Sequence, residues 1–162
     1  MVLPGSYRIR LRVGTTTQEQ PLVVTPDPRG RADQALLAEQ FRFLKQLRDT
    51  VHAVTTAIIT MRNARAQLED DLPRLSGAAA TRARQLITSL ATIEDSLYQR
   101  RNMDVEDDLL YPPRVTERIS SLFGMAESSD GKPPQQVYDV FALFAPKIQA
   151  LLTAYRAALR DG

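Results

Sequence analysis

The sequence contains no cysteine, no tryptophan and a single histidine, His52. Without cysteine the chain has no thiol nucleophile, no disulfide and no thiolate ligand for zinc or an iron–sulfur cluster. One histidine cannot by itself build a histidine-based metal site, and no catalytic triad can be recognised around it. Because His52 lies off the apolar stripe of its predicted helix, we interpret it as a solvent-facing or flanking residue.

Several functional signatures are also missing. The sequence lacks the motifs GxGxxG, GxxxxGK[ST], HExxH and GxSxG, which mark nucleotide, metalloprotease and hydrolase sites. The formal net charge of +2 is too small to indicate a nucleic-acid partner. No apolar run approaches the roughly 18 residues of a membrane span, and residues 1–5 do not resemble a signal peptide. We therefore expect no nucleic-acid partner and no membrane span.

The composition is that of a folded protein, since 43% of the 162 residues are hydrophobic and 25% are charged. The chain opens on a strict alternation over residues 6–13, in which Tyr7, Ile9, Leu11 and Val13 share one face and Arg8, Arg10 and Arg12 share the other. This period of two predicts a strand, and Gly14 predicts a turn into a return strand over 17–24. Pro21 places that strand at an edge or at a bulge.

The arginine row has two readings. It binds an acidic partner, or it is a set of edge charges that prevents strand-to-strand aggregation. We favour the second reading because it needs no ligand. A lone hairpin is barely stable in water, so its apolar face must be covered by a helix, by missing strands or by another chain.

A very long helix follows, beginning near Asp33 as N-cap and ending at Asp71 or Leu72, before Pro73. Its apolar residues fall on two interleaved heptad series: Leu37, Leu44, Val51, Ile58 and Leu72, and Leu47, Val54, Met61 and Leu68. Gln40 and Arg65 interrupt the stripe. A rod of about 55 Å is stable only if partner helices cover this seam.

Three further helices are predicted. The second covers 78–100 and folds back on the first, with a seam of Ala83, Leu86, Leu90, Ile93 and Leu97. Residues 102–113 form a linker. A short third helix begins at Pro113 and ends at Gly124, with Val115, Ile119 and Leu122 inward. After a loop over 126–134, the last helix covers 135–159, where Pro146 predicts a kink near 142–146 or a division into two shorter helices.

Candidate chemistry is confined to acidic residues. Glu69, Asp70 and Asp71 form a metal or partner site, or only a frayed helix end, which we favour. Asp104, Glu106, Asp107 and Asp108 lack the spacing of a calcium loop, and nothing places a glycosidase pair of them at a cleft. Phe141, Phe144 and Tyr155 are interpreted as core. We predict no catalytic, cofactor-binding or metal-ligating residue, and a chain that is not an enzyme.

Three stretches carry a family resemblance: residues 4–14 (PGSYRIRLRVG), 20–24 (QPLVV) and 27–29 (DPR). They resemble the end of the Ig-like module near the C-terminus of large bacterial sortilin-type (BNR-repeat) β-propeller proteins, often labelled glycosyl-hydrolase-like. In that family the last hairpin passes through an Asp-Pro-Arg turn into a terminal helical domain, to which residues 108–113 (DLLYPP) and Arg118-Ile119 are similar. The propeller is absent here, because the chain has no tryptophan and no Asp-box repeat, so no hydrolase residue is carried over.

The predicted fold is mainly α (α+β): a hairpin domain over residues 1–29, the remnant of an Ig-like module, and an antiparallel helical bundle over 30–162. We expect a non-catalytic structural or interaction domain, the C-terminal appendage of an exported, periplasmic or extracellular, propeller protein. Its partner would be the missing β domain or another chain, and no cofactor is expected. Two alternatives stay open: a self-standing helical adaptor that homodimerises through the first helix, and part of a glycoside-hydrolase-like enzyme without its catalytic propeller.

Overall fold

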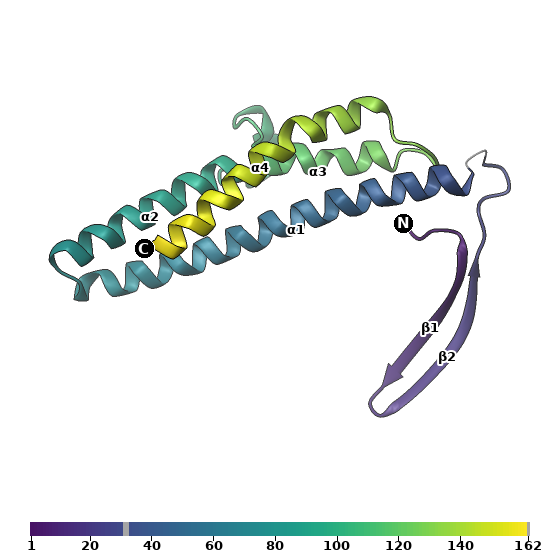
Figure 1. Ribbon diagram of the computed structural model, residues 1–162, viewed down its shortest axis with the longest axis horizontal. Coiled ribbons are helices and arrows are strands. Elements are labelled where there is room, and N and C mark those ends of the chain that lie inside the picture. The colour runs from purple at the N-terminus through teal and green to yellow at the C-terminus, as the bar shows by residue number, and fades with distance from the viewer. Residues whose placement is uncertain (31–32, 162) are drawn as a thin grey trace.

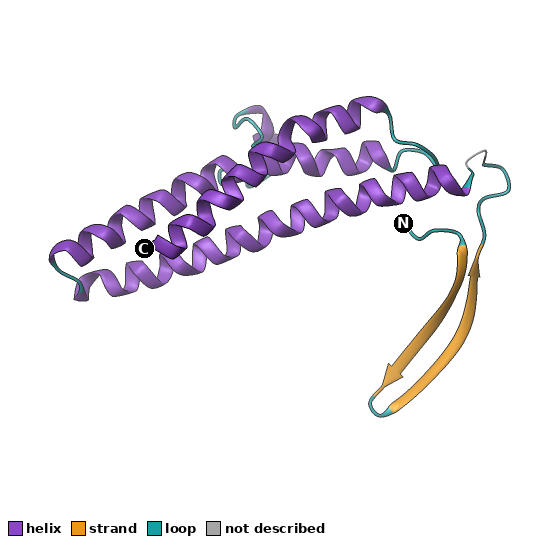
Figure 2. Cartoon of the chain, viewed as in Figure 1, coloured by secondary structure: helices purple, strands orange, loops and turns teal. Residues whose placement is uncertain are grey.

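The computed structural model describes residues 1–30 and 33–161 and shows a two-stranded hairpin followed by a helical bundle (Figures 1 and 2). The predicted fold class is therefore confirmed. In chain order the elements are β1 (Gly5–Val13), β2 (Thr16–Val24), α1 (Gln34–Asp71), the 3₁₀ turn η1 (Leu72–Arg74), α2 (Gly77–Leu97), the 3₁₀ turn η2 (Val105–Leu109), α3 (Val115–Ala126) and α4 (Gln135–Asp161).

The hairpin is antiparallel and keeps one register from Gly5 opposite Val24 to Val13 opposite Thr16. Gly14 opens the two-residue turn with a φ of 58°, a conformation that glycine adopts without strain. Pro21 sits opposite Arg8 in the continuous ladder, so its strand is an edge strand without a bulge. Both strands are edges because the sheet has only these two members.

Helix α1 begins and ends where the sequence predicts. The Asp33 side chain accepts a hydrogen bond from the Leu36 backbone N–H at 2.8 Å, which is the expected N-cap, and Pro73 lies in the 3₁₀ turn that follows the helix. The side chains that α1 buries are Leu37, Gln40, Phe43, Leu44, Leu47, Val54, Ala57, Ile58 and Met61. The predicted seam is thus covered by the chain's own later helices.

The bundle is built on α1 as its longest member (Figure 1). Helix α2 folds back beside the C-terminal half of α1, and α3 lies beside the N-terminal half of α1. Together α2 and α3 therefore run back along the length of α1. Helix α4 then runs across both and contacts α1, α2 and α3. One core forms between these four helices, and its fully buried members include Leu47, Met61, Leu90, Leu97 and Ile119.

The predicted end of α2 and the predicted bounds of α3 were wrong, and contacts with α3 explain where α2 stops. Helix α2 stops at Leu97 rather than at 100, because the Thr116 hydroxyl donates to the Leu97 carbonyl at 2.6 Å and Glu117 accepts the Gln99 N–H at 3.0 Å. Helix α3 begins at Val115, two residues after Pro113, and continues past Gly124 to Ala126. Contacts with a later helix, rather than local propensity, therefore set the end of α2.

The predicted linker over 102–113 contains a 3₁₀ turn, η2, that the sequence did not reveal. The carboxylate of Asp107 accepts hydrogen bonds from the backbone N–H groups of Met103 and Asp104 at 2.7 and 3.0 Å. This acid stabilises its own loop. The side chain of Asp108 lies outside the described part of the structure.

Helix α4 is continuous through Pro146, so the division into two shorter helices was wrong. Figure 1 shows the helix changing direction about halfway along its length, the bend that an internal proline favours. On its inner face Phe141 packs edge-on against Phe43 with ring centroids 5.7 Å apart. Phe144 and Tyr155 are half-buried against the same core, as predicted.

Candidate functional site

The apolar face of β1 is uncovered in the described structure. Tyr7, Ile9, Leu11 and Val13 are 40%, 53%, 61% and 67% exposed. On the same face Leu22 of β2 lies opposite Tyr7 and is 39% exposed. A row of side chains that alternates as a buried strand does, yet lies in solvent, is the most distinctive surface of the chain.

The opposite face of the hairpin carries charge of both signs. Glu19 of β2 lies directly opposite Arg10 and forms ion pairs with Arg10 and, at 3.1 Å, with Arg8. Arg12 instead donates to the carbonyl of Gly14 at 3.3 Å. The sequence reading treated the arginines as an unmatched row and missed Glu19, which the cross-strand register brings between two of them. Exposed pairs of this kind add little stability but set the register of the strands.

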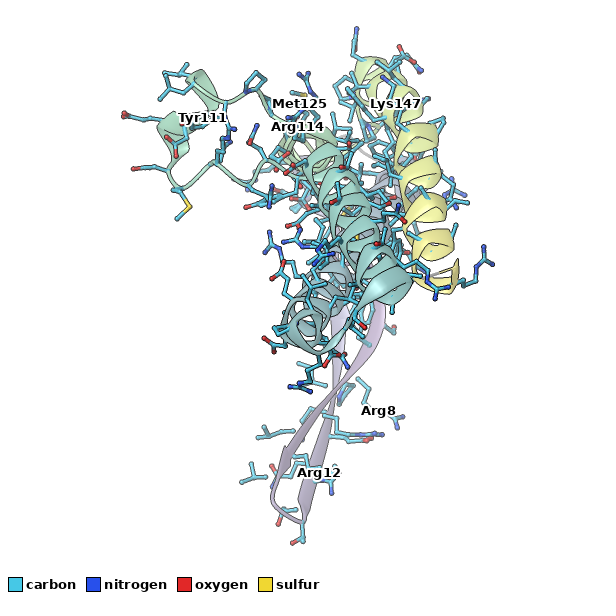
Figure 3. The ribbon with its side chains drawn as sticks, turned by 90° about the vertical axis from the view of Figure 1, so that its left-hand side faces the viewer. Arg8, Arg12, Tyr111, Arg114, Met125 and Lys147 are labelled. Atoms are coloured by element: carbon cyan, nitrogen blue, oxygen red, sulfur yellow. The ribbon has the colours of Figure 1, made fainter. Side chains whose placement is uncertain are left out.

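The hairpin stands clear of the helices (Figures 1 and 3). Among the described residues neither strand packs on a helix. Only the base of the hairpin approaches the bundle, at a hollow of about 140 Å³ where Met1, Val24 and Leu37 are neighbours. The apolar face of β1 is therefore available for a partner.

The turn between hairpin and bundle is held by its own side chains. Asp27 accepts the Arg29 backbone N–H at 2.9 Å and two bonds from the Arg29 guanidinium at 3.0 and 2.8 Å. The Gly30 N–H donates to the Asp27 carbonyl at 3.0 Å. Donation by the Arg29 side chain, and then by its backbone N–H, holds the pKa of the exposed Asp27 carboxyl below its usual 3.8. The predicted Asp-Pro-Arg turn thus forms a compact, charge-assisted corner.

The bundle contains a buried ionic cluster, of which the sequence analysis singled out Arg65 but not Glu94. Glu94 of α2 is fully buried and accepts from Arg62 and Arg65 of α1, each at 2.6 Å. Arg65, predicted as a break in the seam, is the partner that compensates this buried carboxylate. Glu94 was missed because it lies between Ile93 and Leu97, in a helix whose buried face was predicted from its apolar residues alone. The cluster joins α1 to α2 and leaves no free carboxylate.

The second polar break, Gln40, is also structural. Its side-chain amide donates to the carbonyls of Ala126 and Ser129 at 2.6 and 2.7 Å. These carbonyls belong to the end of α3 and the loop after it, so the bond ties α1 to α3. Both interruptions of the heptad pattern are therefore sites where α1 is joined to another segment.

The remaining sequence candidates do not converge. His52 is exposed on α1, as expected. At the end of the same helix, Glu69 and Asp70 are exposed, and Asp71 pairs with Arg74 at 3.5 Å. Within the described residues no group of three or more histidine or acidic side chains is placed to hold a metal ion.

Among the described residues one helix is long and apolar enough to cross a membrane, by length and composition only: Gln135–Arg160 of α4. In the most apolar window of this helix, 22% of the residues are buried. In this structure Val137, Phe141, Ile148 and Leu152 of that helix are part of the bundle core. The expectation that the chain has no membrane span stays a prediction.

Comparison with known proteins gives no match: no family model, no curated protein and no solved structure is similar to the chain. The resemblance to sortilin-type propeller proteins therefore stays a prediction.

Proposed function

We propose that the chain is a non-catalytic structural and interaction domain whose hairpin completes a separate β domain. In this proposal the chain is the C-terminal appendage of an exported sortilin-type (BNR-repeat) β-propeller protein. One observation carries the proposal: the apolar face of β1 lies in solvent on a two-stranded sheet. The proposal connects this face to the Ig-like module that residues 4–29 resemble.

The physical support begins with the instability of the hairpin. Two strands alone bury too little surface to be stable, and three or more strands or a covering helix are needed. The missing cover fits a β domain better than a helix. A sheet packed about 10 Å away would bury Ile9 and Leu11, and an added strand would pair with a free edge.

The bundle supports this role by being complete without the hairpin. Its core lies among four helices and includes no residue of β1 or β2. The Asp27 corner fixes the direction in which the chain leaves the sheet. A bundle with its own core would then be an appendage beside the domain that the hairpin joins.

The absence of catalysis is part of the proposal and is supported by the roles of the acidic residues. Glu94 is bound by two arginines, Glu19 pairs across the hairpin, and Asp107 accepts from its own loop. Each of these carboxylates has a structural partner.

The test is binding to the Ig-like module of a sortilin-type propeller protein produced without its last hairpin. We expect the chain to bind and its β1 amides to become protected from hydrogen exchange. Leu11→Asp should abolish binding because it places a charge in the apolar face. The matched control is Thr17→Asp, on the opposite face beside Arg12, which should bind as the unchanged chain does. Equal binding by both variants, or none by the unchanged chain, contradicts the proposal.

The homodimer alternative has less support, because the α1 seam is covered. Its members are buried or half-buried, and Ile59, at 54% exposed, lies outside the two heptad series. Sedimentation equilibrium should give one 18.1 kDa chain. A dimer that Ile59→Asp dissociates would favour the helical adaptor, whereas one that only Leu11→Asp dissociates would place the contact on the hairpin.

A further inference from the structure

A separate hollow borders the loop between α2 and α3. This loop lies at the top left of the view in Figure 3. Its volume is about 430 Å³, within the range of roughly 300–1,000 Å³ typical of small-molecule sites. The lining residues are Asp95, Gln99, Arg100, Arg101, Leu110, Tyr111, Pro112 and Arg114. None of them belongs to the hairpin, so this site is independent of the proposed function.

The hollow carries an excess of positive charge. Arg100 donates to Asp95 at 2.5 Å, so these two side chains neutralise each other. In the described part of the chain, neither Arg101 nor Arg114 forms an ion pair. Two guanidinium groups therefore border the hollow without a carboxylate partner from the described residues.

The walls of the hollow are fixed by hydrogen bonds. The buried Gln99 donates its side-chain amide to the Pro112 carbonyl at 3.1 Å and accepts the Arg101 backbone N–H at 3.3 Å. The two ends of the loop are thus tied together beneath the hollow. The guanidinium of Arg101 lies over the ring of Tyr111, 5.6 Å from its centroid, which restricts where the charge can point.

We propose that this hollow binds a small organic oxyanion, a phosphate or carboxylate attached to a ring or a short apolar group. Guanidinium groups bind such anions through paired N–H donors, and Arg101 and Arg114 both line the hollow. Leu110, Tyr111 and Pro112 supply an apolar wall for the rest of the ligand.

A purely structural role explains only part of this arrangement. Arg100 pairs with Asp95, and the Arg101 guanidinium lies over the Tyr111 ring, so both side chains have a structural contact. Arg114 is the N-cap residue of α3, where a cation is unfavourable, and the Glu117 carboxylate in the first turn of α3 accepts the backbone N–H groups of Arg114 and Gln99 at 2.9 and 3.0 Å. Glu117 is held by these backbone groups and forms no ion pair with the Arg114 guanidinium, so a bound anion would be the partner of that guanidinium.

Nuclear magnetic resonance titration of the full chain tests the proposal with three probes: phenyl phosphate, benzoate and the neutral benzamide. We expect saturable shifts of backbone amides in residues 95–114 with at least one anion and none with benzamide. The stronger of the two anions identifies the oxyanion. Shifts with neither anion, or equal shifts with benzamide, overturn the proposal.

Substitution of single arginines tests which side chains bind the anion. Arg101→Ala and Arg114→Ala should each weaken anion binding by about tenfold or more, since each removes charge-assisted hydrogen bonds. Arg82→Ala, an exposed arginine of α2 outside the hollow, should leave the affinity unchanged. Arg114→Gln, at an exposed position, repeats the test if a truncation disturbs the helical circular dichroism. Equal weakening by Arg82→Ala would show general charge attraction and overturn the site.

Discussion

The hairpin and the bundle treat their apolar residues in opposite ways. In the bundle Leu47, Leu90 and Leu97 have no exposed surface, whereas Leu11 of the hairpin is 61% exposed. Both regions have a regular apolar pattern, with a helical spacing of three and four in one and a period of two in the other. A pattern determines which side chains share a face, but only a covering element buries that face. The bundle supplies its own cover, and the hairpin does not.

The largest expected contrast comes from truncating one leucine in each region. Leu90→Ala opens a cavity in the bundle core and should lower the free energy of unfolding by about 2–5 kcal/mol. Leu11→Ala removes a side chain that is already in solvent, so we expect a change within about 0.5 kcal/mol. Urea unfolding followed by helical circular dichroism measures both. Equal losses would mean that the hairpin is part of the cooperative core.

A second contrast compares a buried with an exposed carboxylate on the same helix. Glu94→Gln leaves Arg65, whose side chain is only 18% exposed, without its counter-charge, and should cost about 3 kcal/mol. Asp95→Asn breaks an ion pair whose two side chains are 42% and 48% exposed, and should cost less than about 1 kcal/mol. Thermal and urea unfolding of the two variants give the comparison. An equally small loss for Glu94→Gln would show that the cluster is not an important joint between α1 and α2.

The polar joint between α1 and α3 should have an intermediate effect. Gln40→Ala removes two hydrogen bonds and leaves the carbonyl of the buried Ala126 without this partner, so we expect a loss of about 1–3 kcal/mol. The matched control is Gln46→Ala, an exposed glutamine of the same helix, which should change stability by less than about 0.5 kcal/mol. The denaturant midpoints of the two variants measure this difference in stability. A harmless Gln40→Ala would mean that apolar packing alone holds α3 on α1.

The smallest effect concerns pH. Burial, then the charge of Glu39 and a hydrogen bond to it, raises the pKa of Tyr138 above its ordinary 10.0. The folded state therefore holds the phenol proton more tightly than the unfolded state does. The stability from this group is present below pH 10 and falls as the pH rises through the raised pKa. Tyr138→Phe should remove this part of the alkaline loss, measured as unfolding midpoints between neutral and alkaline pH. An unchanged slope would contradict the assignment.

The sequence predicted the fold well where local signals are strong. Asp33 as N-cap and Pro73 as a stop predicted the bounds of α1, and the alternation around Gly14 predicted the hairpin and its turn. Such signals act within a few residues, so a single sequence displays them. The apolar seam also predicted that later helices would cover the rod.

What the sequence did not reveal depends on contacts between distant segments. Glu94 meets Arg62 and Arg65 across about thirty positions, and periodicity cannot pair such residues. The end of α2 is set by Thr116 and Glu117 of another helix. The exposure of the β1 face was left open for the same reason, since alternation predicts a buried face without naming its cover.

Hydrogen exchange of the isolated chain, resolved by residue, tests the central claim most directly. We expect amides of β1 and β2 to exchange far faster than those of α1 around Leu47 and Val54, because an uncovered hairpin opens without unfolding the bundle. Addition of the covering β domain should then slow the strand amides and leave those of α1 unchanged. Strand amides that are as protected as the α1 core in the chain alone would contradict the account, because the hairpin would then need no partner.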